Sequence, residues 1–142
     1  LGNIEVSGHD AALLFRKMPS RFSKVLLDVP CSSERHVLGS PAHLEKWSPA
    51  RTKHLSIQAF AMLASALEVV RPGGVILYST CALSPFENDE VVGKLYGKRK
   101  GRFRVEEVRL PFGEKTRYGW QVLPDASGGR GPMYAAKIRR ID

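Results

Sequence analysis

The sequence predicts an α/β protein whose parallel sheet is finished by an antiparallel edge. Two short apolar runs, Lys24–Asp28 and Val75–Ser79, have the length and composition of buried strands. A long amphipathic segment, which begins at Ser48-Pro49, separates them, and further strand candidates gather near the C-terminus. Strand, helix, strand, helix and then clustered strands is the element order of that fold class.

The first elements are weaker than those that follow. Asn3–Ser7 is a short strand candidate, and Ala11–Lys17 is a weak helix. Lys24–Asp28 is an apolar run that ends in an acid, which suits a strand covered on both faces of a sheet. Residues 32–48 are polar and irregular, so we expect a loop there.

The central helix has clear signals at both ends. Ser48 is a good N-cap and Pro49 a good first helical residue. The helix should run to about Val70 and stop at the sequence Arg71-Pro72-Gly73-Gly74. Its apolar residues recur at steps of three and four, which predicts a broad face that packs on the sheet; they are Leu55, Ala59, Phe60, Leu63, Ala66, Leu67 and Val70.

A second helix should follow the second strand. Ser84-Pro85-Phe86-Glu87 has the form of a capping box, with Ser at the N-cap and Glu three residues later, and it predicts a helix to about Tyr96. Three later segments are strand candidates: Phe103–Leu110, Trp120–Leu123 and Met133–Arg139.

The composition indicates one small domain with an anionic partner. The 142 residues carry a net charge of +8, and the sequence pI is about 9.8. Lys98–Arg104 holds five basic residues in seven, and it is either a solvated turn or an edge that contacts phosphates. The sequence has no apolar run of the roughly 20 residues that cross a membrane, so we expect no membrane partner.

Neither cysteine nor histidine spacing indicates a metal. The two cysteines lack the CxxC spacing of a zinc site, and the four histidines share no spacing typical of metal ligands. Two cysteines are also too few for a disulfide framework. They are either small buried apolar residues or residues with a chemical role.

A shared design at two strand ends favours the chemical role. Asp28-Val29-Pro30-Cys31 follows the first apolar run, and Ser79-Thr80-Cys81 follows the second. Ligands of open α/β sheets bind outside the carboxyl ends of the strands, so both thiols should lie at the reactive edge, close together if the strands are adjacent. A thiolate that attacks carbon 6 of cytosine makes carbon 5 reactive toward a methyl group. That reaction needs a cysteine, a group that holds the base and a group that helps to expel the product.

These motifs resemble those of a known family. DVPC, RPGGVILYSTC and ALSPFENDEVV are similar to segments of the NOP/Sun-domain RNA cytosine-5 methyltransferases, and GPMYAAKIRR is similar to the closing strand of that family. The resemblance runs from about Asn3 to the end of the chain. It implies a Rossmann-like S-adenosylmethionine-dependent methyltransferase fold, with S-adenosyl-L-methionine as cofactor and RNA as partner.

The resemblance also implies roles for single residues. Cys81 would be the nucleophile, Cys31 would aid release of the methylated RNA, and Asp28 would contact the base and the cofactor. Asp10 matches the acid that holds the cofactor's adenine, although it is equally well placed as a helix N-cap. Further candidates for contacts with RNA or cytosine lie in the same two motifs and the loop after Cys31: Pro30, Arg35, His36 and Thr80.

Within the family, DVPCSSERH and GPMY are most similar to the mitochondrial branch that modifies small-subunit ribosomal RNA. The resemblance therefore implies a mitochondrial protein that acts on ribosomal RNA, with a nuclear, nucleolar or cytoplasmic location as the alternative. An accessory RNA-binding protein is a further expected partner.

One part of the family pattern is missing. The Gly-rich cofactor loop, similar to Cys-Ala-Ala-Pro-Gly-Gly-Lys, does not occur, and Pro72-Gly73-Gly74 stands after a helix rather than after a strand. We therefore expect residues 1–142 to be the C-terminal part of one catalytic domain, from its third strand onward, without its first two strands. The missing initiator Met agrees with a fragment. Two alternatives remain: an inactive fragment and a non-catalytic ribosome-assembly protein on the same fold.

Overall fold

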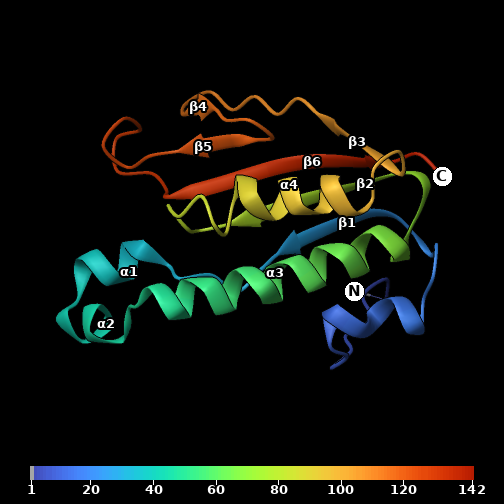
Figure 1. The fold of residues 1–142 in the computed structure, drawn as a ribbon, viewed down its shortest axis with the longest axis horizontal. Coiled ribbons are helices and arrows are strands. Elements are labelled where there is room, and N and C mark those ends of the chain that lie inside the picture. The colour runs from blue at the N-terminus through green and yellow to red at the C-terminus, as the bar shows by residue number, and fades with distance from the viewer. Residues whose placement is uncertain (1) are drawn as a thin grey trace.

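The computed structural model describes residues 2–142 as a twisted six-stranded sheet with helices packed against it (Figure 1). The strand order is β1-β2-β6-β5-β4, and β3 also pairs with β6. β1 and β2 are parallel, whereas every other pair is antiparallel, which confirms the predicted fold class. The strands are β1 (Phe22–Asp28), β2 (Val70–Thr80), β3 (Phe103–Glu106), β4 (Glu114–Lys115), β5 (Trp120–Val122) and β6 (Met133–Arg140).

The core lies between the sheet and its two longest helices, α3 (Pro49–Val69) and α4 (Asp89–Lys98). Both helices contribute apolar side chains to one cluster with alternate residues of the central strands; it includes Leu27, Leu63, Leu67, Ile76, Tyr78, Val92, Leu95, Tyr134 and Ile138. The smaller helices are η1 (Ala11–Arg16), α1 (Glu34–Gly39) and α2 (Pro41–Lys46). None of the described helices has the length and apolarity required of a membrane span.

The opposite face of the sheet is open at β1 and β2. The expectation that the strand at Lys24–Asp28 is covered on both faces is therefore wrong in this structure. Leu27 of β1 is buried, but Leu26 is 72% exposed, and Leu77 of β2 is 37% exposed on the same side. Among the described residues, β1 pairs only with β2, so it is an edge strand. The apolar run of β1 therefore has only one covered face in this structure, and the other face carries leucine side chains to solvent.

The predicted strand at Asn3–Ser7 is wrong, since residues 4–10 have no regular structure. A strand needs a neighbour to pair its backbone groups, and no described strand lies beside this segment. The weak helix predicted at Ala11–Lys17 is confirmed as η1, a 3-10 helix that ends at Arg16.

The predicted loop at residues 32–48 contains two short helices, α1 and α2. Each has six residues, which is too short for an apolar period to show in the sequence. α2 still follows a local rule, because Ser40 before it is extended and Pro41 is its first residue.

The central helix was predicted almost to the residue. The Ser48 hydroxyl accepts a hydrogen bond from the Arg51 backbone nitrogen at 3.2 Å, and α3 ends at Val69. β2 then begins at once and is longer than predicted, because Arg71–Gly74 forms an irregularity inside the strand. Gly73 has φ of +76° there, a conformation that favours glycine.

The predicted capping box is wrong. Residues 85–88 form a turn, and α4 begins only at Asp89. The Glu87 side chain does not return to Ser84, because it bonds to Ser32 on another segment. A tertiary contact has overridden a local signal. The three C-terminal strand predictions are confirmed as β3, β5 and β6, although β3 ends four residues earlier than predicted.

Arg140 connects the end of α3 to the sheet. Its side chain is buried, and its Nη1 lies 3.0, 3.1 and 2.8 Å from the carbonyl oxygens of Leu67, Glu68 and Val70. The last carbonyls of a helix have no partner within the helix, and the Arg140 guanidinium supplies them with a charged donor. The Glu68 carbonyl also accepts from the Ser20 backbone nitrogen at 2.9 Å.

We predict that Arg140→Met lowers the free energy of unfolding by about 3 kcal/mol, because buried carbonyls lose a charged donor. The measurement is urea unfolding followed by circular dichroism. Arg104→Met is the matched control, since that side chain is 65% exposed and its partner is Glu106. It should change the free energy by less than about 1 kcal/mol. Equal effects of the two substitutions would contradict the role given to Arg140.

Candidate active site at the ends of β1 and β2

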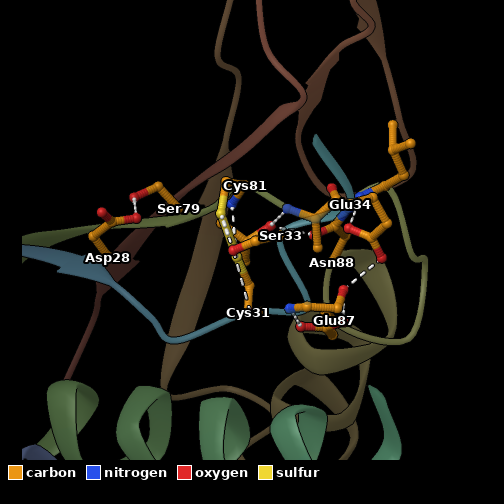
Figure 2. The surroundings of a disulfide bond; sticks show 12 residues. Asp28, Cys31, Ser33, Glu34, Ser79, Cys81, Glu87 and Asn88 are labelled. Atoms are coloured by element: carbon orange, nitrogen blue, oxygen red, sulfur yellow. Dashed lines mark hydrogen bonds between the residues drawn. A yellow bond between two sulfur atoms is a disulfide. The ribbon is translucent and has the colours of Figure 1, made fainter. Parts of the chain in front are cut away.

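The parallel pairing of β1 with β2 brings their carboxyl ends together. Asp28 stands opposite Ser79 in the register, and the Val29 backbone nitrogen donates to the Ser79 carbonyl at 3.2 Å. The Ser79 hydroxyl also donates to Asp28 Oδ1 at 2.9 Å (Figure 2). The other carboxylate oxygen of Asp28 has no hydrogen bond within the described chain, and the residue is exposed. Asp28 can therefore accept a donor from a ligand at this edge.

The two cysteines meet just beyond these strand ends. Their Cα atoms lie 6.3 Å apart, and their sulfur atoms are joined as a disulfide in this structure (Figure 2). The Cys81 backbone nitrogen also donates to Cys31 Sγ at 3.3 Å. The prediction that adjacent strands place both sulfurs together is confirmed. Their linkage was not expected from the sequence.

Ser33 is a site residue that the sequence did not single out. Its Oγ lies 3.1 Å from Cys81 Sγ and 3.5 Å from Cys31 Sγ. The residue adopts a left-handed conformation, with φ of +55°, which turns the chain from Cys31 into α1. The only sequence signal was its place two residues after Cys31.

A pocket of about 370 Å³ opens beside Cys81. Five of the predicted residues line it together: Asp28, Arg35, His36, Thr80 and Cys81. The other lining residues are Ser33, Ser79 and residues 131–133, where β6 begins. Pro30 is exposed and does not line this pocket. Cys31 does not line it either, but its sulfur contacts Cys81, which does. The Arg35 Nη1 donates to the Gly131 carbonyl at 3.2 Å, which closes one side.

Thr80 shapes the turn after β2. The residue is 1% exposed, its hydroxyl donates to Asn88 Oδ1 at 2.6 Å, and it accepts from the Ala82 nitrogen at 3.1 Å. These bonds use the Thr80 hydroxyl to support the turn that carries Cys81. A contact of Thr80 with RNA stays a prediction.

Asp10 stands apart from this group. Its Oδ1 accepts from the Ala12 nitrogen at 2.9 Å, which is the N-cap alternative considered from the sequence. The helix that it caps is tied to the C-terminal half of α3, where the Phe15 nitrogen donates to Ser65 Oγ at 3.2 Å. The described residues do not bring Asp10 to the pocket beside Cys81.

Two glutamates were also missed. Glu34 of α1 and Glu87, whose side chains are labelled in Figure 2, both bond to the buried Ser32 side chain. Burial raises the pKa of the Glu87 carboxyl above its usual range. In the sequence, Glu87 was instead assigned to a capping box with Ser84, three residues before it.

The basic run Lys98–Arg104 lies at the other end of the sheet. Phe103 pairs with Arg140, whereas Thr80 beside the cysteines pairs with Tyr134, so the length of β6 separates the two places. The run spans the last residue of α4, a turn at residues 99–102 and the start of β3, and Arg102 makes ion pairs with Glu68 and Asp142. A contact of the run with phosphates stays a prediction. The described residues include no group of three or more potential metal ligands.

We predict that mild oxidation with diamide links Cys31 to Cys81 within one chain, because their Cα separation of 6.3 Å suits a disulfide. The measurement is peptide mass spectrometry without reduction, with thiol titration before and after dithiothreitol. The Cys31→Ser variant is the control and should give no internal link. Two thiols that survive oxidation in the wild type would show that the strand ends do not bring the sulfurs together.

Comparison with known proteins identifies the family of this chain and supports its fold. The model of the family described as "16S rRNA methyltransferase RsmB/F" matches residues 1–139. A mitochondrial tRNA (cytosine(34)-C(5))-methyltransferase of Danio rerio is 32% identical over 97% of this chain and 41% of its own length. The ribosomal RNA small subunit methyltransferase B of Thermus thermophilus is 34% identical over 91% of this chain and 32% of its own.

Solved structures give the same result. The NSun6 protein of Pyrococcus horikoshii, crystallised with SFG, has a TM-score of 0.80 and 26% identity, and the match covers 99% of this chain and 35% of that one. A methyltransferase homologue from the same organism, at 24% identity, has a TM-score of 0.71 over 98% of this chain and 45% of that one. The chain thus spans about two fifths of the length of the Danio rerio relative. The family resemblance is confirmed, and the chain belongs to the 16S rRNA methyltransferase RsmB/F family.

Proposed function

We propose that this chain carries the catalytic residues of an RNA methyltransferase that transfers a methyl group from S-adenosyl-L-methionine to carbon 5 of cytosine. The observation that carries the proposal is the meeting of Cys31, Cys81 and Asp28 at the shared edge of β1 and β2, beside a pocket. Family membership supports the reaction class.

Cys81 is the proposed nucleophile. It lies on the pocket wall, directly after the central strand β2, and Ser33 Oγ lies beside its sulfur. In the reduced protein, its thiolate forms a bond to carbon 6 of the cytosine ring, and carbon 5 gains the electron density needed to accept a methyl group. Loss of the carbon 5 proton then lets the bond to Cys81 break, which restores the aromatic ring and the free thiol.

Asp28 and Cys31 support this step. The free oxygen of Asp28 can accept the exocyclic amine of cytosine or an N–H group of the cofactor, because it is exposed at the pocket. Cys31 is the proposed residue that assists departure of the methylated base, and its contact with Cys81 supports this role. A disulfide holds both thiols out of this chemistry, so the reaction requires the reduced form.

The residues of this chain supply only part of what a site for S-adenosyl-L-methionine requires. Asp28 offers an acceptor at the pocket, but the sequence contains no Gly-rich loop between a strand and a helix. When bound, the cofactor supplies an electrophilic methyl group. We therefore propose that residues 1–142 are the C-terminal part of one catalytic domain, and that further chain covers the open face around Leu26 and Leu77.

The proposed substrate is ribosomal RNA, and the proposed location is the mitochondrion. The family description and the Thermus thermophilus relative support ribosomal RNA, whereas the Danio rerio relative is named for transfer RNA and for mitochondria. Assays of the intact protein on mitochondrial ribosomal RNA and on mitochondrial transfer RNA, read by bisulfite sequencing, distinguish the two substrates. An accessory RNA-binding protein remains a proposed partner.

We predict that Cys81→Ala abolishes methyl transfer and covalent capture of RNA, because no bond to carbon 6 can form. Cys31→Ala should instead leave the protein trapped on RNA, since departure of the product fails. Each variant of the intact protein is incubated with RNA, S-adenosylmethionine and dithiothreitol, and adducts are read on denaturing gels. An adduct with Cys81→Ala and none with Cys31→Ala would reverse the two roles.

We also predict that residues 1–142 alone bind S-adenosylmethionine more weakly than micromolar. A hydrogen bond to a charged group contributes roughly 1.5–3 kcal/mol, and micromolar affinity needs about 8 kcal/mol. Asp28 supplies one such bond, and Asp10 is already used as a helix cap. Isothermal titration of the purified chain checks this, with the longer protein as the positive control. Micromolar binding by the short chain would refute the proposed division of the domain.

A further inference from the structure

The side chain of Ser32 joins two carboxyl groups that come from different segments. Ser32 is buried, and its Oγ lies 2.5 Å from Glu34 Oε1 and 2.5 Å from Glu87 Oε1. The Ser32 backbone nitrogen also donates to Glu87 Oε2 at 2.9 Å. Glu34 completes the connection, because its Oε2 accepts from the Leu83 nitrogen at 3.0 Å, two residues after Cys81.

The number of hydrogens restricts how these groups are ionised. A serine hydroxyl has one hydrogen, and an ionised carboxylate can only accept. Ser32 can therefore bond to both carboxyl groups only if one of them carries a proton and donates it to Ser32 Oγ. If both were ionised, one carboxylate would face an oxygen lone pair at hydrogen-bond distance, in a buried place.

Glu87 is the better holder of that proton. It is 1% exposed, whereas Glu34 is only partly buried, and burial favours the neutral form of a carboxyl group. Burial is the largest cause that raises the pKa of the Glu87 carboxyl, and the negative charge of Glu34 raises it further. The hydrogen bonds from Ser32 and the positive charge of Arg51 act in the opposite direction, and the net direction is upward. The Tyr78 hydroxyl, below it on β2, donates to the Glu87 carbonyl at 2.5 Å and leaves the carboxyl group to Ser32.

We propose that Glu87, in its protonated form, is a positioning residue that holds the Cys31 segment against the turn of Cys81. Its carboxyl O–H donates to Ser32 Oγ, the Ser32 hydroxyl donates to Glu34, and Glu34 accepts from the backbone of the Cys81 turn. Ser32 is the neighbour of Cys31 in the chain, so this connection fixes the separation of the two sulfurs. The inference rests on the proposed function, in that it names a positioning residue for the same two cysteines.

The first test measures the sulfur separation without any methyl transfer. The rate at which diamide links Cys31 to Cys81 is compared in the wild type, Glu87→Gln and Glu87→Ala. Glutamine keeps a donor for Ser32 Oγ and an acceptor for the Ser32 nitrogen, so its rate should stay within about twofold of wild type. Alanine removes both bonds, and its rate should fall by about tenfold. Glu90→Ala, an exposed residue of α4, is the matched control and should leave the rate unchanged.

A second test follows pH. Because the pKa of folded Glu87 is raised, its contribution to stability is fully present below the unfolded value of about 4.3 and is lost as pH rises through the folded value. The melting temperature of the wild type, relative to Glu87→Gln, should therefore fall as pH rises through that window and then stay level. This readout also covers the case in which Glu87→Ala does not fold. A Glu87→Gln variant that is as damaged as Glu87→Ala in linking rate would overturn the proposal.

Methyl transfer by the intact protein separates this inference from the proposed function. Glu87→Ala should lower kcat by about tenfold with little change in KM, and Glu87→Gln should restore it. If linking rates follow the expectation but no variant methylates RNA, the positioning role stands and the proposed function fails. If RNA is methylated but Glu87→Ala changes neither the diamide linking rate nor kcat, the positioning role is wrong and the proposed function stands.

Discussion

The parallel pairing of β1 with β2 is the constraint on which the site depends. It sets Asp28 opposite Ser79, and the bond from the Val29 nitrogen to the Ser79 carbonyl continues that register past the end of β1. A shift of one residue in the pairing would turn the side chains of β1 to the other face, so Leu27 would leave the core and the Cys31 segment would start in the wrong direction. Burial of Leu27 thereby fixes the place of a cysteine four residues later.

Beyond the strands, three consecutive polar residues before and at the start of α4 hold the surrounding loops. Glu87 bonds to Ser32, and Asn88 accepts from Thr80 and donates to the Ala82 carbonyl at 2.9 Å, around Cys81. Asp89 accepts from the Tyr134 hydroxyl at 2.7 Å and from three groups of residues 116–118. One short segment thus connects both cysteine segments to the antiparallel part of the sheet. The capping-box interpretation failed because the Glu87 side chain bonds to the distant Ser32 instead of to the backbone at Ser84.

The sequence predicted those parts of the structure that depend on periodicity and on strand ends. The apolar steps and the Ser48-Pro49 signal located α3, and the two strand-end motifs placed Cys31 and Cys81 at one edge. The failures have a common cause in contacts between distant segments. The strand at Asn3–Ser7 has no described neighbour, and the open face of β1 could not be read from an apolar run that looks the same whether covered or not. Ser33 and Glu87 belong to the site through contacts with residues 48 and 55 positions away in the sequence, and neither contact has a local signal.

The two cysteines differ in how the chain holds them, and the difference fits the roles proposed for them. Cys81 follows β2, which is paired on both sides by β1 and β6, so the backbone up to Thr80 is fixed by sheet hydrogen bonds. Cys31 lies three residues beyond an edge strand, and side-chain bonds through Ser32 and Ser33 hold it instead. A nucleophile needs a fixed place relative to the ring it attacks, because small displacements reduce the rate strongly. A residue that assists departure must stay close to the nucleophile, and at Cys31 the bonds of Ser32 and Ser33, rather than sheet pairing, set that distance.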